Sequence, residues 1–177
     1  MEPEDIVSSY QNETVDLILD TAKVVYNEEA ERFKQVESKT SITLTFIGVL
    51  IGFYLSYLSS FTPVTNNTGY LIYTYLFKIV ILLLFSLSIL FFIRSIGVGK
   101  FEQLDLNNIV LISFAKSEPN QSKLEIAQTY KDSIDLNRTQ INKKIESYKY
   151  GLNIMLIGFL LFIFHFIVEG VIINVIK

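Results

Sequence analysis

Residues 41–77 read SITLTFIGVLIGFYLSYLSSFTPVTNNTGYLIYTYLF, and this stretch contains no Asp, Glu, Lys, Arg or His. A helix needs about 20 apolar residues to cross the hydrocarbon core of a bilayer, because each residue adds about 1.5 Å. Residues 41–60 supply one such span, and the remainder supplies a turn and the start of a second. The stretch therefore predicts an integral membrane protein with a helical hairpin.

Two further apolar runs complete the expected architecture. The second span is expected at about residues 72–97, and its densest part reads IVILLLFSLSILFFI. It closes the transmembrane hairpin of residues 41–99. The third span is expected within residues 151–177. The sequence thus predicts an all-α membrane protein with three transmembrane helices.

The first polar segment, residues 1–40, has ten acidic and four basic residues, a formal charge of −6. Its apolar residues recur every three or four positions between Val15 and Val36, which is typical of an amphipathic helix. Glu28 and Arg32 form an expected ion pair one turn apart. No Gly or Pro follows Val15 before Phe46. We therefore expect one long cytosolic helix that continues into the first span.

The second polar segment, residues 100–150, balances eight basic residues against seven acidic ones. Residues 107–115, NNIVLISFA, are apolar but too short to span, and they predict a short interfacial helix or strand. A helical stripe follows over residues 123–150, and Ser122 and Glu125 have the spacing of a capping box. We expect this second long cytosolic helix to continue into the third span.

Basic residues set the expected orientation. The turn at residues 61–69 has none, whereas the 100–150 segment has eight, and Lys34 and Lys39 precede the first span. The positive-inside rule then places the N-terminus and the 100–150 segment in the cytoplasm, and three spans leave the C-terminus outside. The acidic start does not predict a cleavable signal peptide. The expected location is the inner membrane.

Small residues recur every four positions in the first span, at Gly48, Gly52, Ser56 and Ser60. Such a ridge lets a second helix approach closely, because helices in lipid associate through packing. The partner is a helix of the same chain or of a second copy. We refer to these four residues as the small-residue ridge.

Ionisable residues inside the spans are candidate functional groups. Lys78 is either a functional intramembrane charge or a residue whose long stem reaches the outer interface. His165 and Glu169 lie four apart on one helix face. The pair indicates either a proton or cation relay, or two residues in the outer leaflet whose polar groups are satisfied by hydrogen bonds.

Two residues are candidates for a conformational switch. Asn137 falls on the apolar stripe of the second cytosolic helix, where a polar residue fixes the register of paired helices at some expense of stability. Gly151 stands where that helix passes into the third span, and glycine weakens a helix interior. Together they predict a resting arrangement that is unique but not very stable.

Composition excludes several kinds of chemistry. The chain has no Cys and only one His, so thiolate sites and disulfides are ruled out and a His-rich metal site is not expected. No nucleotide-binding or catalytic motif occurs. The bases of residues 100–150 are matched by acids, which argues against nucleic acid as a partner. We expect no enzyme activity, no cofactor and no metal.

The two places where a polar helix enters a span resemble the small membrane effectors of bacterial anti-phage defence, of the Pycsar and SLATT types. The first is a helix that ends in a lysine and enters a glycine-containing span. The second is a helix with spaced Asn and Lys before the last span. The residues that carry this resemblance are Glu37–Ser41, Phe46–Gly48, Tyr130, Asn137, Asn142, Lys144 and Tyr148–Leu152.

The resemblance implies a homo-oligomer that alters membrane integrity and stops growth of the infected cell. The 177 residues include no nucleotide-sensing domain, so we expect the trigger to come from a cytosolic partner or from the cytosolic helices. Two alternatives stay open. One is a non-conducting membrane scaffold that recruits a cytosolic defence enzyme, and the other is a small channel or transporter subunit.

Overall fold

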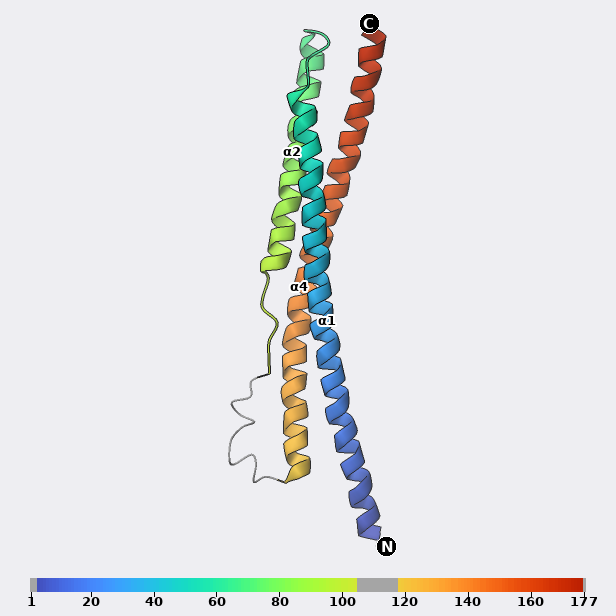
Figure 1. Cartoon of the computed structure of the whole chain (residues 1–177), viewed down its shortest axis with the longest axis vertical. Helices are drawn as coiled ribbons and strands as arrows, with labels where there is room; N and C mark the ends of the chain where they lie inside the picture. The colour runs from blue at the N-terminus through green and yellow to red at the C-terminus, as the bar shows by residue number, and fades with distance from the viewer. Residues whose placement is uncertain (1–2, 105–117, 177) are drawn as a thin grey trace. The chain divides into compact units, whose positions relative to one another are not determined.

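The computed structural model describes the backbone of residues 3–104 and 118–176 and the side chains of residues 12–104 and 118–175. Within these residues the structure is helical and has no strand (Figure 1). Each helix is long and apolar enough to cross a membrane, which confirms the predicted all-α fold and fits a multi-pass membrane protein. The interfacial element expected at residues 107–115 lies outside the described residues. The helices are α1 (Pro3–Ser59), α2 (Thr68–Gly97) and α4 (Pro119–Ile176).

The helix ends differ from the predicted ones for local reasons. α2 starts at Thr68, four residues earlier than expected, because the Asn67 side chain accepts hydrogen bonds from the backbone of Gly69 and Tyr70. α4 starts at Pro119, where a fixed φ suits the first helical turn. The prediction of a capping box at Ser122 and Glu125 is therefore wrong. Ser122 lies inside α4, and its hydroxyl donates a hydrogen bond to the Glu118 carbonyl.

The chain divides into two compact units. Unit 1 comprises Met1–Val36 and Gly99–Asn142, and unit 2 comprises Glu37–Val98 and Lys143–Lys177. α1 and α4 each contribute residues to both units. All of α2 belongs to unit 2.

Unit 2 is a three-helix bundle in which α2 runs opposite to the segments of α1 and α4 (Figure 1). The buried residues of α2 alternate at spacings of four and three, which is the heptad pattern of helices packed knobs into holes. Aromatic residues fill the centre, and Phe85 and Phe92 are completely buried. The buried α2 residues are Thr74, Lys78, Ile81, Phe85, Ser88, Phe92 and Ser95.

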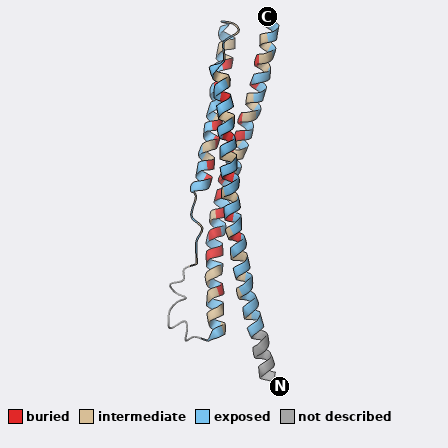
Figure 2. Cartoon of the chain, viewed as in Figure 1, coloured by how far each residue is buried: buried red, intermediate tan, exposed pale blue. Residues whose placement is uncertain are grey.

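Figure 2 shows that exposed positions occur along the helices of unit 2, and many of these positions carry large apolar side chains, whereas several buried residues are polar. This distribution suits hydrocarbon surroundings, because exposed leucine and phenylalanine are stable in lipid and buried polar groups must find partners there. Exposed apolar residues occur on every helix of the bundle. Examples are Phe46, Phe53, Leu83, Leu90, Leu160 and Phe164.

Unit 1 pairs the first part of α1 with the first part of α4, and the segment Gly99–Leu104 packs against both. Phe101 inserts its ring between Tyr26 and Phe33, with ring centroids 5.4 and 5.5 Å apart. Gly99 has a φ of +59°, a conformation that favours glycine. This glycine therefore lets the chain turn into the extended segment.

Candidate functional site

The first buried polar group of unit 2 surrounds Glu169 on α4, whose side chain is 4% exposed. Its carboxylate accepts a hydrogen bond of 3.0 Å from the Tyr70 hydroxyl and one of 2.8 Å from Thr74 Oγ1. Both donors come from the first turns of α2. We call Tyr57, Tyr70, Thr74, Lys78, His165 and Glu169 the Glu169 cluster. The cluster joins all three helices of the bundle.

His165 lies in the same cluster and is fully buried. Its Nε2 atom is 3.9 Å from Glu169 Oε1, and its ring stacks on Phe77 at 13° between the planes. Neither ring nitrogen makes a hydrogen bond to a described residue. The structure therefore brings the predicted pair together, but the hydroxyls of α2 rather than His165 satisfy the carboxylate.

Lys78 is the third predicted intramembrane residue, and it is 5% exposed. Its ammonium lies over the ring of Phe61 and 5.1 Å from the ring centroid of Tyr57. Phe61 belongs to the turn after α1, so the stem of Lys78 extends toward that turn. The ammonium makes no hydrogen bond to a described residue.

Several tyrosines lie near the turn between α1 and α2, and they differ in burial and in partners. Tyr54 is completely buried, and its hydroxyl donates a 2.8 Å hydrogen bond to the Lys78 carbonyl. Tyr70 donates to Glu169, as described above. Tyr75 is half exposed. The hydroxyls of Tyr57 and Tyr73 are buried and make no hydrogen bond to a described residue, so only Tyr54 and Tyr70 of this group tie the helices together through their hydroxyls.

A second buried polar group, the Lys144 cluster of Glu37, Thr40, Ser95, Ile96 and Lys144, lies where α2 ends. The Lys144 side chain is fully buried, and its ammonium donates to Glu37 Oε1 at 2.9 Å and to the Ile96 carbonyl at 2.9 Å. Ser95 Oγ donates a hydrogen bond of 2.9 Å to the Lys144 carbonyl. A cation at this place is favourable, because the last carbonyls of a helix carry partial negative charge.

The small-residue ridge faces away from the bundle. Gly48, Gly52, Ser56 and Ser60 are all exposed, and a Cβ added at either glycine would meet nothing within 4 Å. The intrachain partner that the sequence left open is therefore excluded within the described residues. Close intrachain packing occurs instead at glycines of α4.

Gly151 and Gly158 are the glycines that allow this close packing. A Cβ at Gly151 would lie 2.9 Å from the Phe92 ring, and one at Gly158 would lie 3.1 Å from the Phe85 ring. Ser88 Oγ also donates a 2.7 Å hydrogen bond to the Gly151 carbonyl. The structure thus gives Gly151 a packing role in an unbroken helix, and the switch role that the sequence assigns to Gly151 stays a prediction.

Asn137 has a different partner from the one its position on the helical stripe suggested. It is fully buried, and its amide pairs with the backbone of Glu102, accepting at 2.7 Å and donating at 3.1 Å. The Tyr26 hydroxyl donates to the same Glu102 carbonyl at 3.2 Å, and burial raises the pKa of Tyr26. Asn137 therefore holds the segment Gly99–Leu104, rather than a facing helix, within unit 1.

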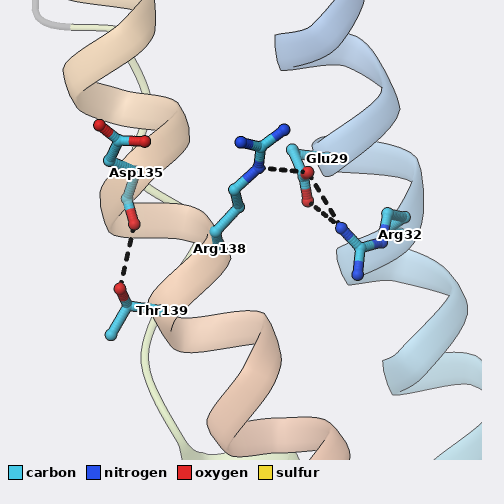
Figure 3. A network of polar contacts seen from close by, with 5 residues as sticks. All are labelled: Glu29, Arg32, Asp135, Arg138 and Thr139. Atoms are coloured by element: carbon cyan, nitrogen blue, oxygen red, sulfur yellow. Dashed lines mark hydrogen bonds and ion pairs between the residues drawn. The ribbon is translucent and has the colours of Figure 1, made fainter.

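An ion-pair network links the two helices of unit 1 (Figure 3). The Glu29 carboxylate is 4% exposed and accepts hydrogen bonds from Arg138 Nε at 2.9 Å and from Arg32 Nη1 at 2.9 and 3.0 Å. The same carboxylate raises the pKa of the Arg138 guanidinium. The expected Glu28–Arg32 pair is wrong, since Arg32 pairs with Glu29, which faces α4.

Pockets occur in both units. A groove of about 670 Å³ in unit 1 is lined by α1 residues such as Leu17 and Val25 and by α4 residues such as Ala127 and Ile134. In unit 2 a pocket of about 250 Å³ borders Glu169. The described part of the chain contains no group of three or more His, Asp or Glu side chains that could hold a metal ion.

The described residues thus form three helices with many exposed apolar side chains and two buried polar clusters, which fits a multi-pass membrane protein. Comparisons with protein families, with characterised proteins and with solved structures found no match to this chain.

Proposed function

We propose that this protein is an oligomeric effector of the inner membrane that perturbs membrane integrity, or forms a pore, during anti-phage abortive infection. The observation that carries the proposal is the exposed small-residue ridge on α1. Gly48, Gly52 and Ser56 lie in line on α1, and Ser60 directly follows the end of that helix. Such a line of small residues suits close contact with another helix, and no helix of this chain provides it within the described residues. A second copy can provide it.

The packing of unit 2 supports an assembly rather than a channel through one chain. Its centre holds the completely buried rings of Tyr54, Phe85 and Phe92, which pack in the hydrophobic core between the three helices. Ion flow therefore requires several copies, or a rearrangement of this bundle. An oligomer joined through the ridge meets the first requirement.

The proposed trigger acts on unit 1. α1 and α4 contribute to both units, so a change in how they pack in unit 1 is transmitted along the two backbones to their spanning segments. The Glu29–Arg138 ion pair and the Asn137–Glu102 pair are the contacts that such a trigger would alter. The proposed orientation places unit 1 in the cytoplasm, where a partner can reach it.

The experiment measures membrane potential in cells that carry the complete operon and are challenged with phage. We expect wild type to depolarise the membrane after infection and Gly52→Ile to depolarise it less. The matched control is Leu83→Ile on the exposed face of α2. A membrane that keeps its potential under every trigger would overturn the effector proposal.

One observation favours the scaffold alternative. The groove of about 670 Å³ between α1 and α4 in unit 1 is mainly apolar, and its lining also includes the charged residues Lys131, Asp135 and Arg138. Such a groove suits an amphipathic helix of a partner protein. Membrane potential that stays unchanged, together with a cytosolic enzyme that loses its membrane location when Leu17 and Ile134 are changed to Asp, would favour the scaffold.

A further inference from the structure

Lys78 has a buried ammonium group without a hydrogen-bond acceptor among the described residues. The rings of Phe61 and Tyr57 face it, and aromatic faces attract a cation. Rings do not replace the acceptors that the three N–H bonds of an ammonium group use in water. The chemistry that this site lacks is therefore an anionic oxygen.

The nearest carboxylate of the cluster is already engaged. Glu169 accepts hydrogen bonds from Tyr70 and Thr74, and its Oε1 atom also faces His165 at 3.9 Å. Among the residues that the structure describes, Glu169 and Lys78 form no ion pair with each other. An external anion would therefore not displace an existing salt bridge of Lys78.

A pocket of about 290 Å³ lies beside Lys78, and its walls are apolar and aromatic. Its exposed wall residues belong to the apolar surface of unit 2, where Tyr75 is 51% and Ile79 is 58% exposed. The pocket thus opens onto the surface that we assign to lipid. The lining residues are Leu58, Phe61, Tyr75, Lys78, Ile79 and Leu82.

The pocket has the polarity of an amphiphile along its length. Its charged end is near Phe61, in the turn between α1 and α2, because the Lys78 ammonium lies over that ring. Its apolar wall continues to Leu82, one helical turn beyond Lys78 and farther from the turn. A headgroup at one end and a hydrocarbon chain along the other would match this order.

We propose that this pocket binds an anionic phospholipid. The lipid phosphate accepts hydrogen bonds from the Lys78 ammonium, and an acyl chain lies against Leu58, Ile79 and Leu82. Because Phe61 covers the ammonium, its ring moves aside when the phosphate arrives. Phe61 lies two residues beyond Ser59, the last residue of α1, so this movement leaves the helix intact. Inorganic phosphate would meet the same cation but would gain nothing from the apolar walls.

The test uses the purified full-length protein in detergent after removal of bound lipid. Native mass spectrometry records the lipid adducts formed with palmitoyl-oleoyl phosphatidylglycerol and with the phosphatidylcholine of the same chains. We expect wild type to bind its first phosphatidylglycerol molecule about tenfold more tightly than phosphatidylcholine. The phosphate of phosphatidylcholine is shielded by its own headgroup, so the charge-assisted hydrogen bond from Lys78 is lost with that lipid. Lys78→Gln should remove this preference, and Lys78→Arg should keep it.

The matched control is Arg94→Gln, which removes an exposed base from the other end of α2 and should leave the preference unchanged. Circular dichroism shows whether each variant is folded, and the comparison of the two lipids in wild type needs no variant. Equal binding of the two lipids by wild type overturns the proposal, as does an undiminished preference in folded Lys78→Gln. Displacement of phosphatidylglycerol by millimolar inorganic phosphate would assign the site to a free anion instead. These results do not depend on depolarisation, so they are independent of the proposed effector function.

Discussion

The ammonium of Lys144 lies 2.9 Å from the carbonyl oxygen of Ile96, although the two residues are 48 positions apart in the sequence. The contact places a fully buried cation at the C-terminal end of α2 and joins that end to α4. A buried ammonium is stable only when its donors find acceptors, and here two carbonyls and Glu37 provide them. The pairing suggests that Lys144 fixes the position of the C-terminal end of α2 relative to α4.

We predict that Lys144→Met destabilises unit 2 by about 2–4 kcal/mol, because it removes the donor from buried carbonyls at the end of α2. Glu37 contributes less to this loss, since its side chain is 41% exposed. The measurement is reversible unfolding in mixed detergent micelles, followed by circular dichroism. Lys143→Met changes the exposed neighbouring lysine and is the control. Equal stability of the two variants would contradict the prediction.

The glycines of the bundle should respond to alanine in opposite directions. Gly151→Ala should destabilise the protein by about 1–3 kcal/mol, because its Cβ would lie 2.9 Å from the ring of Phe92. Gly48→Ala should be neutral or stabilising by up to about 1 kcal/mol, since nothing lies within 4 Å of its Cβ and alanine favours the helix. The same unfolding assay tests both. If Gly151→Ala proved the more stable variant, a packing role for Gly151 would be untenable.

The small-residue ridge is tested by oligomer mass. Gly52→Ile should shift the protein toward the monomer in detergent, because a branched side chain keeps the partner helix at a distance. Multi-angle light scattering gives the mass of the protein oligomer, with the mass of the bound detergent subtracted. Leu83→Ile, which alters an exposed residue of α2, should leave the mass unchanged. Unchanged mass for Gly52→Ile would remove the ridge from the interface.

The structure changes what we expect of Asn137. Because its amide pairs with the backbone of Glu102, Asn137→Leu should loosen the segment Gly99–Leu104 instead of tightening a helix pair. The expected loss is about 1–3 kcal/mol, the penalty for leaving backbone groups unpaired. Hydrogen exchange at the Glu102 amide should accelerate. The exposed Asn142→Leu serves as the comparison, and protection that is equal in both variants would argue against this role.

Topology is tested with single cysteines, which the natural sequence lacks. Asn66→Cys suits the turn better than Asn67→Cys, because Asn67 caps α2 and Asn66 is exposed. Gln128→Cys reports on unit 1, where Gln128 is exposed. We expect a membrane-impermeant maleimide to label Cys at position 66 in intact cells and to label position 128 only after lysis. Labelling of both from outside would exclude the three-span orientation.

The sequence predicted the helices because their determinants are local. Residues 41–77 lack charge over enough length for a span and a turn, and long stretches without Gly or Pro predicted helices that run into spans. The heptad order of α2 was also readable, since Thr74, Ser88 and Ser95 share one seven-residue repeat with Ile81. That repeat would have revealed the polar positions of the bundle core, which hydropathy alone did not.

By itself, then, the sequence determined that the residues described by the structure form three helices long and apolar enough to cross a membrane, and that His165 and Glu169 share a face. Only the tertiary structure decided which side chains meet across those helices. It turned the ridge around Gly52 outward, gave Asn137 a backbone partner and buried Lys144. The physical reason is that hydropathy and helix periodicity depend on neighbouring residues. The partner of a buried polar group depends instead on segments that can lie about one hundred residues away, such as Glu37 opposite Lys144.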